Sequence, residues 1–198
     1  MQRKDQKRQS SSIDISKWVA KNKTDPEALY WINEAISQER GNKSYLAIMK
    51  QIRAQIYRSK GNIDQALKDI NDALELGRSP DTKAIINQTK AQILLSKGDR
   101  VEADIYIDNA LKLGGSPDTQ AISNQTKAQI LLSKGDLVEA NSYIDNALEL
   151  GRSPDTQAIS NRTKAQILLS QGDLVKADSY IDNALRLGGS PDINQSIN

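Results

Sequence analysis

The residue types that most often perform chemistry in proteins are missing from this sequence of 198 residues, which contains no Cys and no His. A cysteine nucleophile, a histidine general base, a zinc site of Cys and His ligands and a disulfide framework are therefore excluded. Ser–Lys pairs recur at Ser59–Lys60, Ser96–Lys97 and Ser133–Lys134, but each lies at the end of an expected helix. The sequence has no phosphate-binding glycine loop and no cluster of metal ligands, so we expect neither an enzyme nor a bound cofactor.

Side-chain amides are the polar groups that recur most regularly. Two series of amides, which we call ladders, recur at intervals of 37 residues. One is Gln55, Gln92, Gln129 and Gln166, and the other is Asn87, Asn124 and Asn161. An amide can donate and accept a hydrogen bond, so a ladder of amides can pair with peptide backbone whatever its side chains are. We expect the asparagines to form a buried or half-buried hydrogen-bonding spine between repeats, with ligand contact as the alternative.

The spacing of these amides reflects an internal repeat of 37 residues. Proline recurs with the same period, and the repeats are expected at 42–78, 79–115, 116–152 and 153–189. The second and third repeats match at 30 of 37 positions and the third and fourth at 31, whereas the first is a diverged copy. Such identity indicates tandem duplication of one structural unit.

Each repeat is predicted to contain two helices joined by a tight turn. In the third repeat, Ser116 precedes Pro117 as an N-cap would, and the first helix is expected to run to about Ser133. Gly135 suits a left-handed C-cap, Asp136 suits the next N-cap, and Gly151 ends the second helix. One such pair cannot bury its apolar face alone, so the predicted fold class is an all-α solenoid of stacked antiparallel helix pairs.

The two ends differ from the repeats. Residues 1–23 hold seven basic and two acidic side chains. We expect 1–15 to be a basic, disordered tail, with an arm for nucleic acid, an anionic membrane or an acidic protein as the alternative. Residues 16–41 are expected to form a capping helix or an eroded half-repeat, and 190–198 a second disordered tail. Because the last expected helix has no following cap, we expect self-association or a docking partner there, with a tolerated, frayed edge as the alternative.

No apolar run in the sequence approaches the roughly 18 residues of a membrane helix, and no apolar stretch of a signal peptide follows the basic start. We therefore expect no membrane span and a cytoplasmic protein.

The second helices resemble those of the tetratricopeptide repeat. Gly135-Asp136-Leu137-Val138-Glu139-Ala140, followed by Tyr143, Ile144, Ala147, Leu148 and Leu150, looks like the family's second-helix signature. The resemblance covers residues 44–189, although the period is 37 rather than 34. The stretch from Leu131 to Asp155 is also similar to pentatricopeptide repeats, which bind single-stranded RNA. The repeats are net acidic, which argues against nucleic acid as the partner.

The tetratricopeptide resemblance implies a scaffold or adaptor whose first helices line a groove for a peptide or a partner helix. Mapped onto this chain, it implies that nine polar residues bind the partner: Gln51, Gln55, Arg58, Gln88, Gln92, Gln125, Gln129, Arg162 and Gln166. The apolar residues expected on the same stripe are Ile48, Ile85, Leu95, Ile122, Leu132, Ile159 and Leu169.

Overall fold

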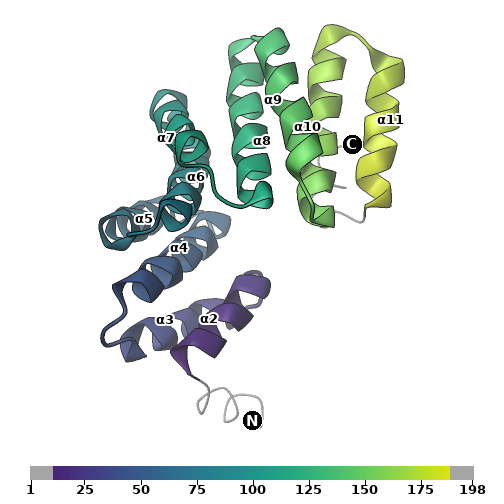
Figure 1. The fold of residues 1–198 in the computed structure, drawn as a ribbon. Coiled ribbons are helices and arrows are strands. Elements are labelled where there is room, and N and C mark those ends of the chain that lie inside the picture. The colour runs from purple at the N-terminus through teal and green to yellow at the C-terminus, as the bar shows by residue number, and fades with distance from the viewer. Residues whose placement is uncertain (1–10, 188–198) are drawn as a thin grey trace. The chain divides into compact units, whose positions relative to one another are not determined.

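The computed structural model describes residues 11–187, and within this range the chain is built of helices joined by short loops, without a strand (Figure 1). The expected all-α architecture of stacked helix pairs is confirmed. The chain divides into two compact units between Asp99 and Arg100. This boundary falls inside the expected second repeat, so its two helices belong to different units.

Unit 1 contains five of these helices. They are α2 (Ser12–Lys21), α3 (Ala28–Gln38), α4 (Lys43–Ser59), α5 (Ile63–Leu76) and α6 (Pro80–Lys97). Helices α2 and α3 pack as a complete hairpin against α4, where the sequence indicated a single capping helix or half a repeat. Helix α2 also begins at Ser12, inside the range 1–15 expected as a tail, because Ser11 caps it by accepting a hydrogen bond from the Asp14 N–H.

Unit 2 contains the other helices of the described range. They are α7 (Arg100–Leu113), α8 (Pro117–Lys134), α9 (Leu137–Leu150), α10 (Pro154–Gln171) and α11 (Leu174–Arg186). Each helix packs on the next along the chain, and α8 also contacts α10. The expected tail at 190–198 lies outside the described residues, as do residues 1–10 of the N-terminal tail.

The helix ends follow the expected capping chemistry. Ser116 accepts a hydrogen bond from the Thr119 N–H at the start of α8, and Gly135 ends this helix with a φ of 81°. Asp136 then caps α9 by accepting from the Glu139 N–H at 3.1 Å. These caps satisfy backbone groups that the helix leaves unpaired, so the predicted turn between the two helices is confirmed.

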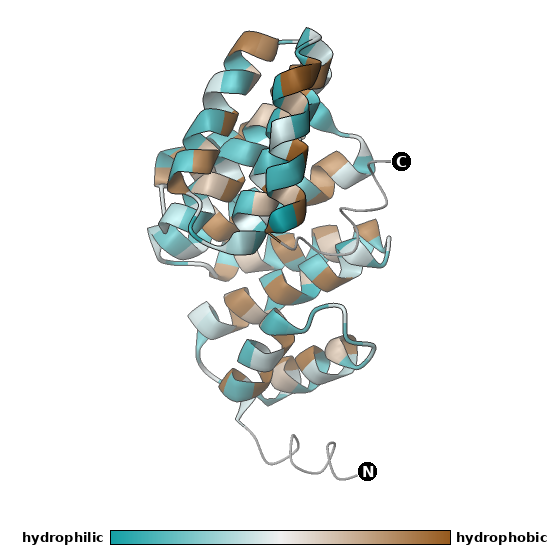
Figure 2. Ribbon diagram, turned by 90° about the vertical axis from the view of Figure 1, so that its right-hand side faces the viewer, coloured by the Kyte–Doolittle hydropathy of each residue, from teal (hydrophilic) through white to brown (hydrophobic). Residues whose placement is uncertain are grey.

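Buried alanines lie where neighbouring helices approach each other. Ala128 on α8 and Ala140 and Ala147 on α9 have no exposed surface. They belong to one apolar cluster with Ile144 and with Ile167 of the following repeat. Each helix carries hydrophobic and hydrophilic residues interleaved along its length (Figure 2), and the hydrophobic ones at these contacts form the core. Small side chains allow the backbones to pack closely.

The asparagine ladder is buried, as expected, but it does not connect the repeats. Asn124 donates its amide N–H to the Gln120 carbonyl of its own helix at 2.8 Å. Asn87 and Asn161 make the same contact one turn back within α6 and α10. The expectation of a spine between repeats is therefore wrong, because these side chains satisfy their helices locally.

Buried lysines connect neighbouring repeats of unit 2 instead. Lys127 on α8 donates to Asp104 and Asp108 of α7 at 2.7 and 2.8 Å. The equivalent Lys164 on α10 donates to Asn141 and Asp145 of α9 at 2.7 and 2.6 Å. We call these the inter-repeat lysine contacts.

The ion pairs between Lys127 and its aspartates shift the pKa values of Lys127 and Asp104. Burial disfavours the charge of Lys127, but the hydrogen bonds to Asp104 and Asp108 outweigh it and raise the Lys127 pKa. Burial likewise opposes the charge of Asp104, but Lys127 and Lys134 lower the Asp104 pKa. The contact therefore stabilises the fold above the unfolded aspartate pKa of about 3.9 and below the unfolded lysine pKa of about 10.4. It is lost as the pH falls through the folded pKa of Asp104 or rises through that of Lys127.

The first prediction concerns Gly151, which follows α9. A Cβ at this position would lie 3.1 Å from the Ala147 carbonyl oxygen and 3.1 Å from the Thr156 methyl group. Gly151→Ala should therefore cost about 1 kcal/mol or more and lower the melting temperature by a few degrees. Gly41→Ala is the control, since its Cβ would meet nothing within 4 Å. Equal melting temperatures for both variants would contradict this packing.

The second prediction concerns the inter-repeat lysine contacts. Asp104→Asn should lower the free energy of unfolding at pH 7 by about 1–2 kcal/mol, measured by urea denaturation. The difference from wild type should shrink as the pH falls below the ordinary aspartate pKa of about 3.9, and it should disappear once the wild-type carboxylate is protonated. Asp178→Asn is the matched control, because Asp178 occupies the equivalent position on α11 and is exposed. A loss in Asp104→Asn that does not change with pH would argue against the ion pair.

Candidate functional site

The first helices of the repeats present a mixed apolar and amide surface, which we call the A-helix face. In unit 1 it comprises Ile48, Gln55 and Arg58 on α4 and Ile85, Gln92 and Leu95 on α6. In unit 2 it comprises Ile122, Gln129 and Leu132 on α8 and Ile159, Gln166 and Leu169 on α10. Spacings of seven and three residues keep each set on one side of its helix.

Several large apolar residues of this face are partly exposed. Ile48, Ile85 and Ile159 are 39, 37 and 38% exposed, and Leu169 is 46% exposed. The glutamines at 55, 92 and 129 are partly exposed, and Gln166 is exposed. Each unit thus offers apolar contact and side-chain amides on the same helices.

The nine polar residues expected in the groove fall into two groups. Gln51, Gln88 and Gln125 are buried, each with about one-twentieth of its surface exposed. The other six keep accessible surface: Gln55, Arg58, Gln92, Gln129, Arg162 and Gln166. The buried three have little surface to offer a partner in this conformation.

Two of the buried glutamines bond to the following first helix. Gln51 donates to the Thr89 hydroxyl at 2.8 Å, and Gln125 donates to the Thr163 hydroxyl at 3.3 Å. In both cases the pair is separated by 38 residues, one more than the repeat period. The sequence carried this signal as a threonine 38 residues after each glutamine, but only the packing shows that the two side chains meet.

Arg162 occupies the position of Gln125 in the last repeat. Its Nε atom is buried and has no hydrogen-bond partner among the described residues. The guanidinium is otherwise partly exposed on α10. One cationic group with unused hydrogen-bonding capacity therefore lies beside the A-helix face of unit 2.

A second cationic region lies on unit 1, where Lys23 in the loop after α2 reaches α4. Its Nζ donates to the Gln55 side-chain oxygen at 2.7 Å. Burial lowers the pKa of Lys23, and the nearby Arg58 guanidinium lowers it further. Burial also lowers the pKa of Arg58. Two partly buried cations thus lie near one end of the A-helix face of unit 1.

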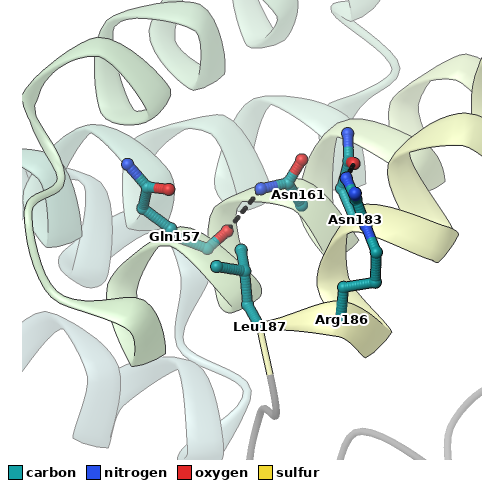
Figure 3. A pocket seen from close by; sticks show the side chains of 5 residues that line it. All are labelled: Gln157, Asn161, Asn183, Arg186 and Leu187. Carbon is teal, nitrogen blue, oxygen red and sulfur yellow. Dashed lines mark hydrogen bonds between the residues drawn. The ribbon is translucent and has the colours of Figure 1, made fainter.

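A pocket of about 500 Å³ lies between α10 and α11 (Figure 3). It is lined by Gln157, Asn161, Asn183, Arg186 and Leu187. Asn161 already donates to the Gln157 carbonyl, and Arg186 donates to the Asn183 side chain. These walls offer hydrogen bonds and one cation, but neither a carboxylate nor a nucleophile with a base beside it, so the pocket gives no support to catalysis.

Comparison with known proteins connects this geometry to a family. The tetratricopeptide repeat model matches residues 49–78, which span most of α4 and all of α5. A search of curated proteins by sequence gave no match. None of the helices in the described range is both long and apolar enough to cross a membrane.

Several solved structures share the fold at low sequence identity. PilW, a widely conserved type IV pilus biogenesis factor, is 21% identical with a TM-score of 0.67, over 87% of this chain and 77% of its own. BtubC from P. vanneervenii is 20% identical with a TM-score of 0.65, over 81 and 72%. YrrB, a TPR protein with an unusual peptide-binding site, is 17% identical with a TM-score of 0.52, over 92 and 87%. The family model thus identifies a tetratricopeptide repeat at residues 49–78, and the solved structures show that the chain shares the fold of tetratricopeptide-repeat proteins.

Proposed function

We propose that the chain is a protein-interaction scaffold that binds an extended peptide segment on the A-helix face. The observation that carries this proposal is the pairing of exposed isoleucines with accessible glutamines on successive first helices. The fold is that of tetratricopeptide-repeat proteins, and one structural relative has a peptide-binding site. A cytoplasmic location remains a prediction.

An extended segment fits this surface better than a partner helix does. The backbone N–H and C=O groups of a helix are bonded internally, so the glutamine ladder could contact only its side chains. An extended peptide leaves backbone donors and acceptors free for the amides of Gln129 and Gln166 in unit 2. The isoleucines beside them would bury apolar side chains of the same segment.

RNA binding is the alternative that the pentatricopeptide resemblance raised, and the placement of the lysines weighs against it. Lys127 and Lys164, which recur in the repeats, are buried and paired with acidic or amide side chains of the preceding helix. They are therefore occupied in the fold, whereas binding to phosphates requires accessible cations.

The third prediction tests the glutamine ladder. Peptides of 12 residues should be selected from a random display library against the wild-type protein, and their Kd measured by calorimetry. The double variant Gln129→Ala with Gln166→Ala should lose about 2 kcal/mol, or roughly 30-fold in affinity, as two hydrogen bonds disappear. The control variant, Asn109→Ala with Asn146→Ala, removes two exposed amides from the second helices and should bind normally.

Two results would overturn the peptide proposal. One is a selected peptide whose affinity is the same for both double variants. The other is failure to enrich any peptide while a single-stranded RNA oligonucleotide binds with an affinity that falls steeply with salt.

A second interaction is suggested by the outer face of α11. On α7 and α9, the positions equivalent to Asp178 and Asp182 bind the side chains of Lys127 and Lys164, respectively. On α11, Asp178 and Asp182 themselves are exposed. Leu174, Val175 and Leu185 on the same helix are 62, 83 and 47% exposed. We infer that this face receives a second copy of the chain, whose α2 carries the exposed pair Lys17 and Lys21 at the same spacing of four residues.

The fourth prediction follows from this charge complementarity. Sedimentation equilibrium should show association of the wild-type protein that weakens with added salt. It should also weaken in Asp178→Asn with Asp182→Asn, and in Lys17→Gln with Lys21→Gln. Asp64→Asn, which removes an exposed carboxylate from α5, should associate like wild type. A wild-type protein that stays monomeric at millimolar concentration would exclude the contact.

A further inference from the structure

The fourth repeat presents a surface that, in the third repeat, is covered by the next first helix. Gln125 on α8 donates to Thr163 on α10, and Asn141 and Asp145 on α9 accept from Lys164 on α10. These three positions of the third repeat therefore all face α10. Within the described residues no helix follows α11, so the equivalent positions of the fourth repeat face no further helix there. They are Arg162, Asp178 and Asp182.

Apolar side chains on the same side of α11 are more exposed than their equivalents in the third repeat. Leu174 and Leu185 are 62 and 47% exposed, whereas Leu137 and Leu148 on α9 are partly buried. Spacings of four and three residues place both leucines on one side of α11 with the two aspartates. We call the surface formed by these five residues the end face: Arg162 on α10, and Leu174, Asp178, Asp182 and Leu185 on α11.

Arg162 gives the end face a cation whose hydrogen bonding is incomplete. Its Nε atom is buried and has no partner among the described residues. In the third repeat the same position holds Gln125, whose amide is bonded to the following first helix. A buried N–H without an acceptor costs free energy, so an acceptor from outside would stabilise this end of the chain. A carboxylate suits a guanidinium best, because it can accept two N–H bonds at once.

The end face thus combines one cation on α10 with two carboxylates on α11. Asp178 and Asp182 are exposed, and within residues 11–187 neither forms a salt bridge. A partner that fits this surface carries one carboxylate and two cations on one side of a helix, with apolar surface beside them.

Helix α2 of the same chain has this reversed pattern. Asp14, Lys17 and Lys21 are exposed, and their spacings of three and four residues keep them on one side of the helix. Ile13 lies beside them and is partly exposed. The Ser11 hydroxyl donates to Oδ2 of Asp14, which leaves Oδ1 to accept from another donor. The charges of α2 and of the end face are therefore complementary in sign and in number.

We propose that the end face of one copy binds α2 of a second copy head to tail, with Asp14 of the second copy accepting from Arg162. The two lysines of that helix then pair with the two aspartates of α11. This inference rests on the self-association proposed above. It deepens that proposal by assigning an acceptor to the buried Arg162 Nε and by defining the type of assembly.

The two surfaces of this contact are different and lie on the same chain, so the contact is heterologous. A copy that docks through α2 still has its own end face available, and the contact can repeat. Such contacts produce a ring where the geometry closes and a growing chain where it does not.

The fifth prediction mixes two variants that each keep one surface. The end-face variant, Asp178→Asn with Asp182→Asn, keeps α2, and the α2 variant, Lys17→Gln with Lys21→Gln, keeps the end face. Sedimentation equilibrium should show each variant alone as mainly monomeric at the concentration where half of the wild-type protein is associated. Their equimolar mixture should form a 1:1 complex and stop there, because the two surfaces that remain outside the contact are both disabled.

Charge reversal tests the pairing of Arg162 with Asp14. Arg162→Glu and Asp14→Lys should each weaken association about tenfold or more. Both changes in one chain should restore most of it, because each contact then contains the same pair with its signs exchanged. Arg100→Glu, which reverses an exposed cation at the start of α7, should associate like wild type.

A further variant separates the contact from the stability of the fold. Arg162→Gln installs the residue that the third repeat carries at this position. It should weaken association while its melting temperature stays equal to that of wild type. A melting temperature that falls together with association would instead assign Arg162 to the fold and overturn its pairing with Asp14.

The remaining outcomes distinguish this inference from the proposals on which it builds. Wild-type association without a 1:1 complex in the mixture would keep self-association and overturn the head-to-tail contact. A double reversal that restores nothing would overturn the pairing of Arg162 with Asp14. A wild-type protein that stays monomeric would overturn both self-association and this inference. Neither surface contains Gln129 or Gln166, so none of these results changes the test of peptide binding.

Discussion

Close approach of helices at buried alanines is the constraint on which the rest of this fold depends. Ala128, Ala140 and Ala147 have no exposed surface, and their equivalents in the other repeats are buried as well. A larger side chain at these positions would separate the two helices of a repeat. It would also displace the first helix from the next one, because Ile167 packs into the same cluster as these alanines. The positions of the face residues therefore follow from packing beneath them.

Polar contacts fix the alignment of helices that the apolar packing holds together. An alanine contact alone tolerates sliding and rotation, whereas Lys127 must lie between Asp104 and Asp108 and Gln125 must reach Thr163. The first contact joins α8 to α7 and the second joins α8 to α10, and the side chains of Lys127 and Gln125 are buried. Their net contribution to stability is modest, since burial of charge offsets much of the pairing. Their main consequence is a defined register between repeats.

The repeat, the helix pairs and their caps could be predicted from sequence because proline, glycine and aspartate act locally. The exposure of the groove residues was harder to predict, because a spacing of three or four residues identifies the side of a helix but not how deeply a residue on that side is buried. Gln51 and Gln55 lie on the same side of α4 and both donate to the Thr89 hydroxyl, yet Gln51 is buried and Gln55 is partly exposed. The asparagine ladder failed as an inter-repeat spine for a related reason. A side chain that can bond to its own helix does not need a neighbour.

The change from Gln125 to Arg162 shows how position in the stack alters the constraint on one site. Gln125 is held by Thr163 of the following first helix, and a charged side chain there would lose that hydrogen bond and bury a cation. Arg162 has no such partner among the described residues, so the requirement for a short amide is relaxed. The departure from the repeat at Arg162 thus marks a position where packing against a following helix no longer selects the residue.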